Sequence, residues 1–337
     1  MSDTSDSCKE LGESKLDDDD VCEVKDMLQN LNTGDVDVAV SICANCCKEG
    51  DDINNICNKC KQVRYCNAAC KKKHRSKHKK DCEEHIRRAA ELHDEKLFKQ
   101  PPPEEDCPIC FLRIPSHVSG YKYMVCCGKR ICSGCCYAPL YDDQGNEVEY
   151  EKCPFCRTPT PTSVEEIAER EKKRLEVNDP IAICNHGNYY RDGMNGFAQN
   201  HTKALELWHR AAKLGCAGAY CSIGYAYECG HGVEVDKKKA LHYYEQAAMR
   251  GDESARHYLG YKEGMAGNFD RAVKHYIVAV RSGQNESLEA IKLLYSNGYA
   301  TKDDYTKALQ AYQVYLGDIK SNQRDRAASA DERNRYY

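Results

Sequence analysis

The second half of the chain repeats one pattern of small, apolar and polar positions. The segments 204–215, 240–251 and 272–283 align with one another, and each ends in glycine. The closing glycines are 36 and 32 residues apart, and a fourth copy begins at Ala308, again 36 residues after Ala272. Apolar residues that recur every three or four positions predict amphipathic helices. The pattern therefore predicts a helical repeat.

Each unit also has an upstream half, which contains Gly187, Gly224 or Gly260 at intervals of 37 and 36 residues. Every unit is thus predicted to hold two short helices, and stacked helix pairs build a curved solenoid. The third unit is four residues shorter, which predicts a trimmed loop between its helices. The pattern resembles the Sel-one-like branch of the tetratricopeptide-type repeats over residues 180–317. This resemblance implies a mainly α fold and a surface that recruits protein partners.

Two charged segments outside the repeats are predicted to be helical. Residues 83–100 contain good helix formers without glycine or proline. The run Pro101–Pro103 ends that helix. A second helix is predicted near residues 164–177. We interpret these parts as a helix with a proline-rich linker over 83–106, a helical linker over 158–179, and a charged tail over 318–337.

The N-terminal segment differs in composition from the rest. Residues 1–40 hold twelve acidic and three basic residues and no aromatic residue. Such a sequence cannot bury enough apolar surface to offset chain entropy, so it predicts a disordered acidic tail. It also lacks the apolar stretch of a secretory signal, and no apolar run reaches the length of about 18 residues needed to span a bilayer. These features predict an intracellular protein, cytoplasmic or nuclear, without a membrane partner.

Cysteine is abundant, and its position in the chain is informative. The sequence has 23 cysteines among 337 residues, and nineteen of them lie in residues 1–160. In a reducing compartment, paired cysteines hold metal more often than they form disulfides. Disulfides remain the alternative interpretation.

The first cysteine cluster has the spacing of a double metal site. It reads Cys-x2-Cys, Cys-x2-Cys, Cys-x3-Cys and His-x3-Cys, which gives seven cysteines and one histidine. An x3 spacing places two ligands one helical turn apart on the same face. Thiolates with closed four-coordination select zinc in a structural role. A domain of about 40 residues cannot build a sufficient apolar core, so its folding is predicted to depend on metal.

This cluster resembles the MYND zinc finger over residues 43–82. Ligation in that family is interleaved, which implies one zinc on Cys43, Cys46, Cys66 and Cys70 and another on Cys57, Cys60, His78 and Cys82. The spacing alone leaves sequential pairing open. Several relatives dock proline-containing peptides through a glutamine and a tryptophan; Lys71 and Arg75 stand at those positions here.

The second cluster resembles an all-cysteine RING finger over residues 107–157. The resemblance implies a cross-brace, with one zinc on Cys107, Cys110, Cys132 and Cys135 and another on Cys126, Cys127, Cys153 and Cys156. Lys129 stands where RING fingers usually carry a histidine, so the adjacent Cys126 and Cys127 supply two ligands. Cys136 is the alternative to Cys126. Four structural Zn²⁺ ions are therefore expected in the whole chain.

RING ubiquitin ligases contact the ubiquitin-conjugating enzyme and ubiquitin through positions that Ile109, Pro154 and Arg157 fill here. The first hypothesis is therefore a ligase without a covalent nucleophile, which positions the charged conjugating enzyme for attack while the first finger and the solenoid recruit protein substrates. The alternative is a non-catalytic scaffold for protein–protein interaction. A weaker alternative is a nucleic-acid-associated protein, because residues 71–80 carry seven basic residues and no acidic residue.

Overall fold

The computed structural model describes residues 42–48, 50, 53–102, 105–140 and 151–336. The predicted acidic tail lies outside these residues. The chain divides into two compact units, Met1–Lys99 and Gln100–Tyr337. Among the described residues, no helix is long and apolar enough to cross a membrane.

The first unit holds a hairpin and a long helix. Strands β1 (Asn55–Ile56) and β2 (Arg64–Tyr65) pair antiparallel, and α2 (Ala68–Leu97) follows. The Asn67 side chain caps α2 by accepting a hydrogen bond from the Cys70 N–H at 2.8 Å. The helix predicted from residue 83 thus begins inside the finger itself. Within the described residues, the finger has a small hydrophobic cluster around Cys43, Ile53 and Tyr65.

The second unit begins with the second finger. It contains η2 (Val118–Gly120), β3 (Tyr121–Met124), β4 (Lys129–Cys132), α3 (Ser133–Tyr137) and η3 (Ala138–Leu140). Strands β3 and β4 pair antiparallel, with Tyr121 opposite Cys132. Helix α4 (Val164–Glu176) connects the finger to the repeats, close to the predicted helical segment.

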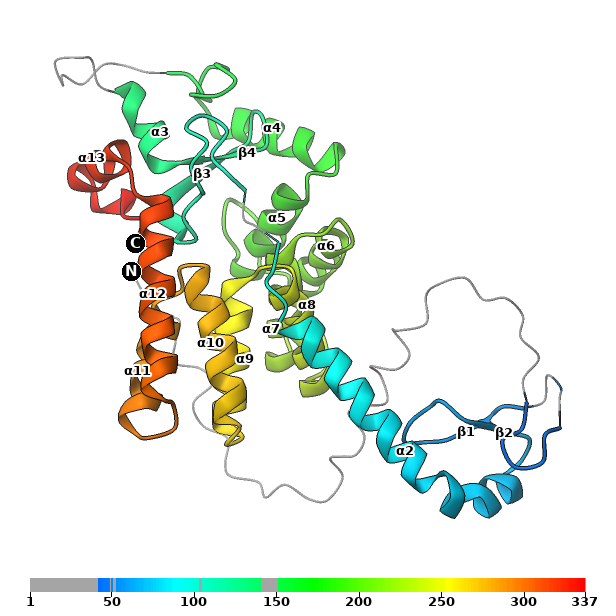
Figure 1. Cartoon of the computed structure of the whole chain (residues 1–337). Coiled ribbons are helices and arrows are strands. Elements are labelled where there is room, and N and C mark those ends of the chain that lie inside the picture. The colour runs from blue at the N-terminus through cyan, green and yellow to red at the C-terminus, as the bar shows by residue number, and fades with distance from the viewer. Residues whose placement is uncertain (1–41, 49, 51–52, 103–104, 141–150, 337) are drawn as a thin grey trace. The chain divides into compact units, whose positions relative to one another are not determined.

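Four successive helix pairs make up the repeat region (Figure 1). They are α5 (Pro180–Asp192) with α6 (His201–Lys213), α7 (Ala217–Cys229) with α8 (Lys237–Met249), α9 (Glu253–Met265) with α10 (Phe269–Arg281), and α11 (Asn285–Ser296) with α12 (Lys302–Ile319). The loop that joins the two helices of the third pair spans only residues 266–268, whereas the corresponding loop of the second pair spans residues 230–236. The predicted trimmed loop is therefore present, and the mainly α solenoid is confirmed.

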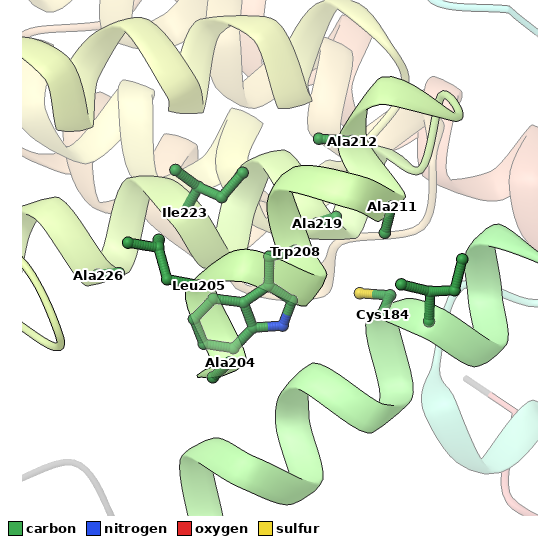
Figure 2. Close-up of a cluster of buried hydrophobic side chains, with 10 residues drawn as sticks. Cys184, Ala204, Leu205, Trp208, Ala211, Ala212, Ala219, Ile223 and Ala226 are labelled. Atoms are coloured by element: carbon green, nitrogen blue, oxygen red, sulfur yellow. The ribbon is translucent and has the colours of Figure 1, made fainter. Parts of the chain in front are cut away.

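Small and aromatic side chains form the solenoid core. The alanines that begin the four aligned copies, Ala204, Ala240, Ala272 and Ala308, are all buried. In the first repeat, Trp208 is 1% exposed and lies among Cys184, Leu205, Ile223 and several alanines (Figure 2). Alanine at these positions lets neighbouring helices approach closely around the large indole ring.

In the first three repeats, the recurring glycine of the first helix faces an aromatic ring of the second helix. Gly187 lies against Trp208, Gly224 against Tyr244, and Gly260 against Tyr276. A Cβ atom at position 260 would lie 2.7 Å from Cε1 of Tyr276. The regular spacing of these glycines therefore reflects the close packing of an aromatic ring of the second helix on the backbone of the first helix.

We expect Gly260→Ala to destabilise the solenoid by about 1–3 kcal/mol, because overpacking forces a buried ring to shift. Gly264→Ala is the matched control in the same helix, since the nearest atom to its Cβ is 3.9 Å away. The control gains helix propensity and should be neutral or up to about 1 kcal/mol more stable. Urea denaturation followed by circular dichroism measures both values. Equal effects of the two substitutions would show that the ring contact is unimportant.

The C-terminal residues continue as ordered structure. Helix α13 (Asn322–Ala330) packs against α3 of the second finger, and η4 (Glu332–Asn334) lies against η2. Arg324, Ala327 and Tyr336 are buried there. The sequence suggested a charged tail because most of these side chains are polar, yet a few buried residues suffice where a neighbouring domain supplies the apolar surface.

Candidate metal centres

Apart from Cys132-x2-Cys135, which opens helix α3, the Cys-x2-Cys pairs of the two fingers form four turns that share one backbone conformation. The residue after the second cysteine has a positive φ in each: 57° at Cys47, 56° at Lys61, 58° at Phe111 and 59° at Arg157. Its N–H donates to the carbonyl of the first cysteine of the turn at 2.9–3.1 Å. This tight turn aims both thiols of the pair at one point, so local sequence already fixes half of each ligand set.

The structure gathers sixteen side chains into four groups of four. Within each group the ligand atoms all lie within 4.8 Å of one another. The groups are Cys43, Cys46, Cys66 and Cys70; Cys57, Cys60, His78 and Cys82; Cys107, Cys110, Cys132 and Cys135; and Cys126, Cys127, Cys153 and Cys156. We call them groups 1 to 4 in this order. The ligands of both fingers are interleaved, so successive ligand pairs along the chain belong alternately to the two groups of each finger.

The distances between sulfurs fit a shared metal ion and exclude bonding between sulfurs. Cys46 and Cys66 Sγ are 3.6 Å apart, Cys57 and Cys82 Sγ 3.7 Å, and Cys110 and Cys132 Sγ 3.8 Å. A tetrahedron with zinc–sulfur bonds of about 2.3 Å has edges of about 3.8 Å. A disulfide bond would be about 2.05 Å long. All cysteines in the described part of the chain are free, so these donor sets fit zinc.

Group 2 combines three thiols with one imidazole nitrogen. His78 Nε2 lies 3.2 Å from Cys60 Sγ, and the side chain projects from α2 into the buried centre of the finger. Burial and the neighbouring charge of His74 lower the pKa of His78. Metal ligation requires the neutral imidazole, so this environment favours the form that binds.

Hydrogen-bond donors surround the thiols of group 1. Burial opposes the charged form of Cys43, but backbone hydrogen bonds from Cys66, Asn45 and Cys46 lower its pKa to about 6. The Asn45 side-chain amide also donates to Cys70 Sγ at 3.4 Å. Donors of this kind stabilise thiolates and orient metal ligands.

The adjacent cysteines 126 and 127 both take part in group 4. Cys126 Sγ lies 3.4 Å from Cys156 Sγ. Thr158 Oγ1 lies 3.1 Å from Cys156, and although burial opposes the charged form, hydrogen bonds from Thr158 lower the pKa of Cys156 to about 6. The alternative ligand Cys136 lies outside every group, and its thiol contacts the carbonyl of Ile131 at 3.7 Å.

The residues predicted to contact a conjugating enzyme lie at the two outer turns of the second finger. Ile109 and Pro154 are half-buried, and Ile109 packs partly against the finger core. Arg157 is exposed and follows the last cysteine of group 4 directly. The geometry therefore leaves the guanidinium accessible to a partner.

One lysine of the basic run 71–80 has a structural role that the sequence did not reveal. Lys71 Nζ donates to the Ile56 carbonyl and to Asn58 Oδ1, both at 2.7 Å. Lys71 therefore ties the start of α2 to the turn that carries Cys57 and Cys60. The other six bases of residues 71–80 are exposed on α2.

Two family models match parts of the chain. The Sel1 repeat matches residues 180–216, 217–252 and 254–284, and the MYND finger matches residues 43–82. The chain therefore carries Sel1 repeats and a MYND finger. The MYND match, together with the cysteine and histidine groups, supports metal binding by a zinc finger.

Individual relatives share part of the chain. Chitin synthase regulatory factor 4 of Schizosaccharomyces pombe is 30% identical over 109 residues, which are 32% of this chain and 17% of that protein. A Sel1 repeat protein from Oxalobacter formigenes is 28% identical with a TM-score of 0.40, over 46% of this chain and 64% of that one. The c5321 antigen of uropathogenic Escherichia coli, with an SLR fold, is 19% identical with a TM-score of 0.39, over 51% of this chain and 43% of that one. This chain spans less than two thirds of each.

Proposed function

We propose that this chain, with its MYND finger and Sel1 repeats, is a scaffold for protein–protein interaction that four structural zinc ions stabilise. The observation that carries the proposal is that each metal group supplies four protein ligands. A zinc ion with four protein ligands has no open position for substrate or water, so its role is structural. Sel1 repeats and MYND fingers typically mediate contacts between proteins, which agrees with this role.

A row of exposed apolar residues on the solenoid supports a protein-binding surface. Tyr225, Tyr261 and Leu293 are each the ninth residue of α7, α9 and α11, and their exposed fractions are 39%, 50% and 63%. Equivalent positions on successive first helices of stacked repeats line one face of a solenoid. Exposed apolar residues that recur in register are typical of a contact surface.

The test is quantitative affinity capture from a cell extract with the full chain and a triple variant, Tyr225→Ser, Tyr261→Ser and Leu293→Ser. We expect the triple variant to lose a defined set of bound proteins at least tenfold. The matched control replaces Leu214, Val235 and Val314, which are equally exposed elsewhere on the same unit, by serine. If both triple variants capture the same proteins as the unmodified chain, the row is not a binding surface.

A second candidate is ubiquitin ligation by the second finger. The specific observation in its favour is the interleaving of groups 3 and 4 in residues 107–157, with Arg157 exposed directly after the last ligand. A planar guanidinium can hydrogen-bond two acceptors at once, as a residue bridging ubiquitin and its conjugating enzyme must. The ligase would then act by positioning the charged conjugating enzyme.

A reconstituted ubiquitination assay with a panel of conjugating enzymes tests this candidate. Zinc-dependent chain formation should fall at least tenfold in Arg157→Ala and in Ile109→Ala. Arg333→Ala is the control, because Arg333 is also an exposed arginine but lies in the C-terminal segment. Absence of activity with every conjugating enzyme would leave the scaffold as the function.

A further inference from the structure

We propose that Arg324 of the C-terminal helix α13 is an outer-shell residue of metal group 3, so that the last residues of the chain form part of the second finger's metal centre. This inference rests on the proposed metal binding by group 3. It assigns a function to a segment that no sequence motif singles out.

Arg324 reaches the finger with both terminal nitrogens of its guanidinium. Nη2 lies 3.8 Å from the Sγ of Cys110, a group 3 ligand, and donates to the Leu112 carbonyl at 3.4 Å. Nη1 donates to the Ile319 carbonyl of α12 at 2.6 Å. The whole side chain is inaccessible to solvent. One planar group therefore links the metal ligands to the end of the solenoid.

Charge explains why an arginine is buried at this point. Four thiolates around one divalent ion carry a net charge of −2, and a buried charge without a counter-charge is costly. No ion pair between Arg324 and a carboxylate is found within the described residues. The thiolates of group 3 therefore serve as its counter-charge.

Further contacts hold the C-terminal segment on the finger. Cys135 Sγ lies 3.8 Å from Gln323 Oε1, and Ser133 Oγ donates to the Asn334 carbonyl at 3.3 Å. Gly134 of α3 packs directly on the backbone of α13, because a Cβ atom at position 134 would lie 2.8 Å from the backbone nitrogen of Arg324. Arg324 is thus held in place from several sides, as a group that tunes a metal site must be.

The prediction is that zinc leaves group 3 faster without the guanidinium. We would follow zinc release from the full-length protein to a chromogenic chelator and compare Arg324→Met with Arg333→Met, which removes an exposed arginine of the same segment. Loss of an outer-shell partner typically lowers metal affinity 10–100-fold. One zinc ion of Arg324→Met should therefore be released at least tenfold faster, and hydrogen exchange should increase in residues 107–135. Release equal to that of Arg333→Met would overturn the proposal.

Arg324→Lys keeps the inference testable if the methionine variant does not fold. Lysine retains the charge, but a single ammonium cannot serve Cys110, Leu112 and Ile319 together. We expect faster release than in the unmodified protein; unchanged release would contradict the role of Arg324. A wild-type protein that binds no zinc would refute the metal sites themselves, whereas zinc binding with equal release in all variants would refute only the role of Arg324.

Discussion

Replacing Cys60 by serine is expected to remove one zinc ion and to unfold the first finger while the solenoid stays intact. In the described residues of this finger, the hydrophobic cluster around the first ligands comprises Cys43, Ile53, Tyr65 and a few partly buried neighbours. Zinc binding contributes on the order of 10–16 kcal/mol per site in peptides of this size. Because Cys60 belongs to group 2 and is fully buried, its loss removes most of the free energy that keeps the finger folded.

Two readouts separate the finger from the solenoid. Native mass spectrometry counts the bound zinc, and hydrogen exchange over residues 53–82 reports whether the finger is folded. Trp208 is the sole tryptophan of the chain and lies in the other compact unit, so the unfolding transition followed by its fluorescence should not change. Cys47→Ser is the matched control, because Cys47 is exposed and outside the four groups. Full protection of the finger in Cys60→Ser would contradict the metal-dependent fold.

Trp208→Ala should produce the largest loss of stability in the solenoid. The indole is 1% exposed, fills the space beside Gly187, and donates from Nε1 to Asn188 Oδ1 at 3.2 Å. Truncating a buried tryptophan leaves a large cavity and typically costs about 3–5 kcal/mol. Urea denaturation followed by circular dichroism measures this loss directly.

Two further variants serve as controls for Trp208→Ala. Trp208→Phe keeps a ring but removes the hydrogen bond to Asn188, so it should cost less than the alanine variant. Leu214→Ala, at a half-exposed position after the same helix, should change stability by less than about 1 kcal/mol. A loss below about 1 kcal/mol for Trp208→Ala would mean that the first repeat does not depend on its buried indole.

Features encoded by local spacing could be predicted from the sequence. The glycine and alanine periods predicted the helix pairs, because each period marks a close contact that every repeat must make again. The four-residue deletion in the third unit predicted the short loop 266–268 for the same reason. The ligand spacing pointed to metal, since four of the Cys-x2-Cys pairs form the same tight turn, which directs both thiols to one point.

Features that depend on distant contacts could not be predicted in this way. Arg324 contacts Cys110 and Leu112 across more than 200 residues of sequence, and nothing near Arg324 marks it as buried. Lys71 was part of a basic run in the sequence, whereas its hydrogen bonds to Ile56 and Asn58 exist only once the first finger has folded. In both cases a charged residue acts through groups that the chain brings to it from elsewhere.

Native mass spectrometry of the full-length protein, purified without chelator or added reductant, tests the central claim most directly. We expect four bound zinc ions, one for each group of ligands, and a denatured mass that equals that of the fully reduced polypeptide. A folded protein without metal, whose denatured mass lacks the hydrogens lost in disulfide formation, would contradict it.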